Sequence, residues 1–156
     1  MLKIEKIAPA FSLVDQDEIK HSLKQYQGKY VLLYFYPKDD TPGCAKEACM
    51  IADVYKDFSK LGIVVLGVSK DSSKSHKKFA TKYNLPFTLL SDPEATVIEK
   101  YEAWKEKKMF GRSFLGIERI SYLINPEGKI ARVYPKVDPA SHALEILKDV
   151  KVLVQK

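Results

Sequence analysis

The chain has 156 residues, 46% of them hydrophobic and 29% charged, a composition typical of a folded protein rather than a disordered one, and we expect residues 1–156 to form one domain. No apolar run approaches the roughly 20 residues of a membrane span, and no signal-peptide core follows Met1, so we expect a cytoplasmic protein without membrane contact. The net charge of +6 is compatible with nucleic-acid binding, so the basic segments of the chain have to be searched for nucleic-acid-binding motifs.

The first predicted elements are a short hairpin and a buried strand. Residues 11–14 and 18–21 flank the turn-like sequence Asp15-Gln16-Asp17, which predicts two short paired strands. Residues 31–36 are hydrophobic without interruption. This pattern is typical of a central strand that is covered on both faces.

A helix is predicted to begin soon after this strand. Thr41 is a suitable N-cap, and Pro42 suits the first helical position, where no backbone N–H is needed. Apolar residues recur at helical spacing from Cys44 to about Ser59, and Gly62 is a stop signal. Cys44 is thereby placed among unpaired N–H groups at the positive end of the helix dipole, which favours a thiolate. The alternative interpretation is a small buried hydrophobic residue.

Further strands and helices alternate along the rest of the chain. The patterns predict strands at 63–68 and 87–90, helices from a cap at Asp71 or Ser72 to Tyr83 and from Ser91 toward Tyr101, a hairpin of 119–124 and 129–134, and a last helix over about 139–150. This order predicts an α/β fold with a mixed central sheet flanked by helices, as in a thioredoxin-like fold with an added N-terminal β-hairpin. Ligands of such open sheets bind beyond the carboxyl ends of the strands, where Cys44 is placed.

Basic residues concentrate in two runs, at 70–82 and 100–112. Both runs also contain acidic residues, and no nucleic-acid-binding motif accompanies them. We therefore interpret both as solvated helix faces and expect no nucleic-acid partner. A basic nucleic-acid-binding or chaperone-like module remains the alternative from a different class.

The segment from Pro37 to Cys44, Pro-Lys-Asp-Asp-Thr-Pro-Gly-Cys, resembles the active-site motif of the peroxiredoxins. The following Glu47-Ala48-Cys49 is similar to the bacterioferritin comigratory protein, or peroxiredoxin Q, subgroup, and the matches at 67–71 and 90–93 extend the resemblance over nearly the whole chain. The resemblance implies a thiol peroxidase that reduces hydrogen peroxide and organic hydroperoxides without a metal, haem or flavin cofactor. It also implies recycling by thioredoxin or a similar dithiol reductant.

The same resemblance implies roles for five residues. Cys44 is expected to be the peroxidatic cysteine, which becomes a sulfenic acid, and Cys49 the resolving cysteine, which forms an intramolecular disulfide with it. Thr41 is expected to hydrogen-bond the peroxide, and Pro37 to shield the thiolate from water. Arg119 matches an arginine that the family places on a later strand, within reach of the thiolate.

A disulfide between Cys44 and Cys49 meets a geometric obstacle if both lie in one helix. Five residues give a rise of about 7.5 Å and a turn of about 140° to the far side, so the Cα atoms would be roughly 8–9 Å apart. That separation exceeds the limit of about 7 Å for a disulfide, so we expect the helix to unwind locally. The alternative is that Cys49 is only a buried helix residue. Because an intramolecular pair needs no partner subunit, we expect a monomer.

Several other residues are open to more than one interpretation. Glu47 either forms an ion pair with Arg119 or is solvated. The three histidines, which include His76, are scattered without metal-ligand spacing, so no metal site is predicted. Asp39 and Asp40 are expected to be solvated in a loop. A thiol–disulfide oxidoreductase is a further alternative, disfavoured because four residues rather than two separate the cysteines.

Overall fold

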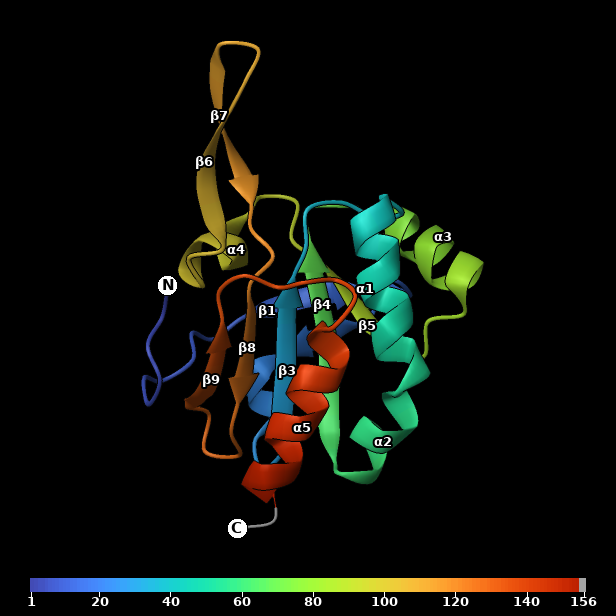
Figure 1. Ribbon diagram of the computed structural model, residues 1–156, viewed down its shortest axis with the longest axis vertical. Coiled ribbons are helices and arrows are strands. Elements are labelled where there is room, and N and C mark those ends of the chain that lie inside the picture. Colours follow the sequence, from blue (N-terminus) through green and yellow to red (C-terminus); the bar gives the residue numbers. More distant parts are fainter. Residues whose placement is uncertain (155–156) are drawn as a thin grey trace.

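The computed structural model, which describes residues 1–154, is built around a seven-stranded mixed sheet in the order β2-β1-β5-β4-β3-β8-β9 (Figure 1). The strands are β1 (Ser12–Asp15), β2 (Lys20–Ser22), β3 (Tyr30–Phe35), β4 (Ile63–Ser69), β5 (Thr88–Ser91), β8 (Ser121–Ile124) and β9 (Ile130–Tyr134). β3 pairs in parallel with β4 and antiparallel with β8, and residues 31–36 are buried. The predicted central strand, mixed sheet and N-terminal hairpin are confirmed.

Helices cover both faces of this sheet. They are η1 (Leu23–Tyr26), α1 (Pro42–Asp53), α2 (Tyr55–Lys60), α3 (Ser73–Tyr83), α4 (Thr96–Lys100) and α5 (His142–Val154). Because side chains alternate along a strand, Leu32 and Tyr34 pack against α1, α2, α3 and α5, whereas Leu33 and Phe35 pack on the opposite face, which α4 covers. No helix within residues 1–154 has both the length and the apolar character needed to cross a membrane.

The start of α1 agrees with the sequence in position but differs in one hydrogen bond. Thr41 is the N-cap residue with extended dihedral angles, and Pro42 occupies the first helical position. The Thr41 hydroxyl does not cap the helix, because it donates to the carbonyl oxygen of Lys38 at 2.9 Å. The prediction of a side-chain cap at Thr41 is therefore wrong, and this hydroxyl belongs to the preceding loop.

The single helix predicted from Cys44 to Ser59 is two helices. α1 ends at Asp53, and Val54 leaves the helical conformation with φ −111° and ψ 12° before α2 begins. The amide of Val54 bonds to the carbonyl of Ile51, three residues back, which tightens the last turn of α1. The stop at Gly62 is confirmed, since its φ of +75° is a conformation that favours glycine.

The second basic run does not form a helix face. Residues 104–117 form β6 (Trp104–Met109) and β7 (Arg112–Ile117), a two-stranded hairpin that projects from the main body (Figure 1). Phe110 and Gly111 both have positive φ, as a two-residue hairpin turn requires. The expectation of a solvated helix face is wrong for this run and correct for the first, whose lysines are exposed along α3.

Candidate active site

Cys44 lies in the first turn of α1, just beyond the carboxyl end of β3, as predicted. Its side chain is buried, with 2% exposure, and it is not in a disulfide. The first turn of a helix leaves backbone N–H groups without helical partners, and these attract negative charge. Burial alone would also fit a merely hydrophobic cysteine, so the charged groups around the site decide between the two interpretations.

Arg119 provides the positive charge next to this helix start. It lies between β7 and β8 rather than on a strand, which corrects the position implied by the resemblance. Its guanidinium packs against Gly43, where an added Cβ atom would lie only 2.5 Å from Nη2. Because Gly43 has no side chain, the guanidinium of Arg119 can lie against the backbone next to Cys44.

Glu47 lies one helical turn after Cys44 and faces the same arginine. Its side chain is 1% exposed, and its Oε1 lies 3.6 Å from Nη1 of Arg119. This separation is too long for a hydrogen bond, and neither carboxylate oxygen has a hydrogen-bond partner within residues 1–154. Burial raises the pKa of Glu47 to about 7, while the charge of Arg119 acts in the opposite direction. The solvated interpretation of Glu47 is wrong, and the structure favours the ion pair with Arg119.

Tyr34, which the sequence analysis did not single out, is a further polar group beneath the site. Its ring packs against Gly67, where an added Cβ would be 2.7 Å from Cζ, and its hydroxyl has no hydrogen-bond partner among the described residues. Burial first, and then the negative groups Glu47 and Cys44, raise the pKa of Tyr34 well above its usual value. Tyr34 is therefore a neutral group at neutral pH. The sequence signal for Tyr34 was its hydroxyl, a polar group within a strand segment of otherwise apolar side chains.

Pro37 and Thr41 lie in the loop that joins β3 to α1, and both are half-buried. The hydroxyl proton of Thr41 is directed to the carbonyl of Lys38, which leaves the lone pairs of Oγ1 free to accept a hydrogen bond. The eight residues 37–44 thus contain a proline ring, a hydroxyl oxygen that can accept a hydrogen bond, and the start of α1.

Cys49 lies farther along α1 and differs from Cys44 in its surroundings. It is half-buried and not in a disulfide, and α1 is continuous from Pro42 to Asp53, so the helical separation of the two cysteines applies. Partial burial and the nearby Asp53 raise the pKa of the Cys49 thiol. The folded helix thus holds Cys49 as a protonated thiol at neutral pH.

The expectation that Asp39 is solvated is wrong. Its carboxylate is buried and accepts hydrogen bonds from the Tyr36 hydroxyl at 2.6 Å and the Ser75 hydroxyl at 2.8 Å, and it pairs with His76 at 2.7 Å. With Asp71, these groups place possible metal-ligand atoms within 4.8 Å of one another, a grouping that the sequence did not reveal. Because hydrogen bonds within the group engage these atoms, we assign it a structural role.

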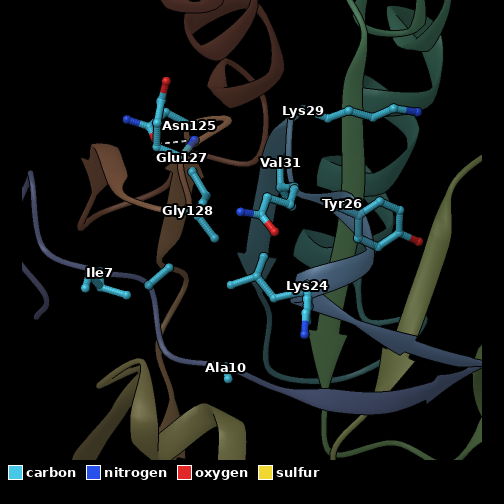
Figure 2. Close-up of a pocket in the computed structure, with 13 residues that line it drawn as sticks. Ile7, Ala10, Lys24, Tyr26, Lys29, Val31, Asn125, Glu127 and Gly128 are labelled. Carbon is cyan, nitrogen blue, oxygen red and sulfur yellow. Dashed lines mark hydrogen bonds between the residues drawn. The ribbon is translucent and has the colours of Figure 1, made fainter.

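A separate cavity lies at the opposite end of β3 from Cys44 (Figure 2). It has a volume of about 190 Å³ and lies between the N-terminal segment, η1 and the turn that joins β8 to β9. Its lining includes Leu23, Val31 and Ile124, with Lys24 and Lys29 among the polar groups. None of the candidate catalytic residues lines it.

Comparison with known proteins identifies close relatives over almost the whole chain. Residues 4–133 match the AhpC/TSA family. A putative peroxiredoxin Bcp from Coxiella burnetii is 51% identical over 146 residues, which cover 94% of this chain and 97% of that protein. Peroxiredoxin Bcp from Bacillus subtilis is 43% identical over 155 residues, which cover 99% of each.

Solved structures show the same fold. A mutant of peroxiredoxin Q from Xylella fastidiosa superposes with a TM-score of 0.93 at 32% identity, covering 98% of each chain. The bacterioferritin comigratory protein of Xanthomonas campestris, studied for its alkyl peroxide reduction activity, superposes with a TM-score of 0.89 at 36% identity, covering 92% of each chain. The fold is therefore that of thioredoxin-like peroxiredoxins.

The buried Glu47 generates a prediction about stability and pH. Its folded pKa of about 7 lies above the ordinary value of 4.5, so between these values the folded protein binds the extra proton. The free energy of unfolding should therefore lose up to about 1.4 kcal/mol per pH unit from this group as pH rises through that window. We expect Glu47→Gln to remove this contribution, measured by urea unfolding at pH 5, 6 and 7. The exposed Glu106→Gln should leave the slope unchanged, and an unchanged slope in Glu47→Gln would contradict the prediction.

Proposed function

The chain belongs to the AhpC/TSA family and is a peroxiredoxin-type thiol peroxidase, and we propose that Cys44 is the sulfur that attacks the peroxide. The observation that carries this assignment is the buried Cys44 in the first turn of α1, with the Arg119 guanidinium packed against Gly43. The N–H groups of this turn and the guanidinium together stabilise an anionic sulfur.

In the proposed reaction, the Cys44 thiolate attacks one oxygen of the peroxide. An S–O bond forms as the O–O bond breaks, and the departing oxygen leaves as water or an alcohol after it takes a proton. Positioned donors that interact with the oxygens as their charge develops supply most of the acceleration. We assign this role to Arg119 and the N–H groups of α1, with Thr41 accepting the peroxide O–H and Pro37 excluding water.

The second step is proposed for Cys49. Its thiol condenses with the Cys44 sulfenic acid, which forms the S–S bond and releases water. Because the intact helix holds the two Cα atoms too far apart and keeps Cys49 protonated, the first turns of α1 must open for this step. Thioredoxin or a similar dithiol then returns both cysteines to thiols.

We propose that residues 1–156 act as one domain, as a cytoplasmic monomer without a nucleic-acid partner.

Replacing each cysteine in turn tests these roles. We expect Cys44→Ser to abolish peroxide turnover, and Cys49→Ser to form a sulfenic acid that recycles poorly unless a small thiol is added. The measurement is thioredoxin-coupled consumption of hydrogen peroxide, with dimedone labelling of the sulfenic acid. Peroxide consumption that survives in Cys44→Ser would refute the proposed function.

Gly43→Ala tests the role of the arginine without changing it. The added Cβ would displace the guanidinium, while alanine is the better helix former by about 1 kcal/mol, so we expect a stable fold. The second-order rate constant of Cys44 with hydrogen peroxide should fall by roughly tenfold or more. In an Arg119→Lys background the same substitution should cost much less, since its target is gone. Equal losses in both backgrounds would contradict a role through Arg119.

Amide hydrogen exchange tests the opening of α1. We expect residues 41–54 to lose protection in the oxidised, disulfide form, because the bond cannot span the intact helix. Protection in α3 should stay as in the reduced protein. Unchanged protection across residues 41–54 would count against local unwinding.

A further inference from the structure

The loop between β3 and α1 is held by a buried network of polar side chains from α3 and the neighbouring strands. We call residues 37–41 the active-site loop. Asp39, at its centre, directs its carboxylate into the protein, where it meets the hydroxyl groups of Tyr36 and Ser75 and the ring of His76. A loop residue with three side-chain partners, two of them buried, has little freedom to move.

His76 connects the active-site loop to the sheet. Its ring is fully buried, with Nδ1 2.7 Å from Oδ2 of Asp39 and Nε2 2.9 Å from the carbonyl oxygen of Leu90. A carbonyl oxygen only accepts, so Nε2 carries a hydrogen and donates it to Leu90, while Nδ1 faces the carboxylate. The imidazole thus bridges the loop to β5, and its place cannot be taken by a side chain with a single donor.

Two further contacts fix the backbone of the active-site loop. The amide of Asp39 donates to Oδ2 of Asp71 at 2.9 Å, and the same oxygen accepts from the Ser69 hydroxyl at the end of β4. At the surface, Asp40 accepts hydrogen bonds from Lys82 at 2.7 Å and Tyr83 at 2.6 Å. All these partners belong to β4, α3 or the segment between them.

The active-site loop in turn sets the position of Thr41. The Thr41 hydroxyl donates to the carbonyl of Lys38, which lies next to Asp39 in the chain. The side-chain hydroxyl of Thr41 is therefore oriented by the loop, while its backbone carbonyl accepts from the Ala45 amide of α1 at 2.8 Å. The described side-chain contacts of Asp39 and Asp40 include none with α1, so they persist when α1 opens.

We propose that His76 and Asp39 are a positioning pair for the peroxide reaction, which holds Pro37 and the Thr41 hydroxyl in reactive geometry against the folded start of α1. This proposal rests on the function proposed above. It assigns to α3 and the active-site loop a fixed half of the site, against which α1 opens and closes. Misplacing reacting groups by about 1 Å can cost on the order of 100-fold in rate, so a remote residue can act this way.

The test compares two reactions of the same sulfur in His76→Phe. Phenylalanine keeps a ring beside Tyr36 but makes neither hydrogen bond. We expect the second-order rate constant with hydrogen peroxide to fall by roughly 10- to 100-fold, because Thr41 is no longer held. Alkylation of Cys44 by iodoacetamide does not use Thr41, and its rate should stay within about threefold of the original.

His21→Phe is the matched control. His21 also bonds to a carboxylate, with Nε2 2.7 Å from Oδ2 of Asp15, but this pair lies on the N-terminal hairpin. It should lower stability without changing either rate. An unchanged peroxide rate in His76→Phe, or equal losses in both of its reactions, would overturn the proposal.

Asp39→Asn keeps the test decisive if His76→Phe does not fold. The asparagine has the same size and retains an acceptor for Tyr36, but it weakens the contacts with Ser75 and His76. A lower ratio of peroxide rate to alkylation rate supports the pair, and an unchanged ratio overturns it. If the unsubstituted protein shows no peroxide consumption that depends on Cys44, the proposed function itself fails, which is a separate outcome.

Discussion

The structure of the site depends on the burial of a carboxylate and a guanidinium at the start of one helix. Glu47 and Arg119 lie 3.6 Å apart, and Glu47 is almost fully removed from water. Removing a carboxylate from water costs several kcal/mol unless partners compensate for the lost hydration, and here its oxygens have no hydrogen bond within the described chain. Burial of Glu47 therefore costs α1 free energy, part of which is relieved by the raised pKa of this carboxyl, about 7. This cost favours the local opening of α1 that we propose for disulfide formation.

The active-site loop beside α1 is well supplied with hydrogen bonds, whereas the Tyr34 hydroxyl beneath the site has no partner among the described residues. Asp39 is hydrogen-bonded to both His76 and Asp71, and the sheet beneath these residues is buried on both faces. The site therefore has two parts: the active-site loop with α3, which is fixed by hydrogen bonds, and the first turns of α1, which are less stable. Peroxide reduction needs fixed donors, whereas disulfide formation needs a sulfur that can move, and a single rigid site could not meet both needs.

Much of this arrangement could be predicted from the sequence, because it depends on local signals. The uninterrupted apolar run at 31–36 identifies the central strand, and Thr41-Pro42 marks the helix start. The errors have a common cause in tertiary contacts. Asp39 looks like an ordinary loop acid until α3 places His76 beside it, and Glu47 looks like a surface residue until Arg119 is brought from 72 positions later. The hairpin at 104–117 was missed for a different reason, because its strands are largely exposed and mix charged with apolar residues, so no clear hydrophobic period marks them.

The break at Val54 has a consequence for the opening of α1 that we propose. It makes α1 a segment of twelve residues, which is marginal as an isolated helix and owes its stability to packing. An isolated helix forms and melts in roughly a microsecond or less, but opening α1 within the protein also breaks its packing, and such local unfolding takes about microseconds to seconds. The packing of α1, rather than helix–coil conversion itself, therefore sets how fast it opens. The interruption ends the conversion before Phe58, whose buried ring anchors α2 to the core.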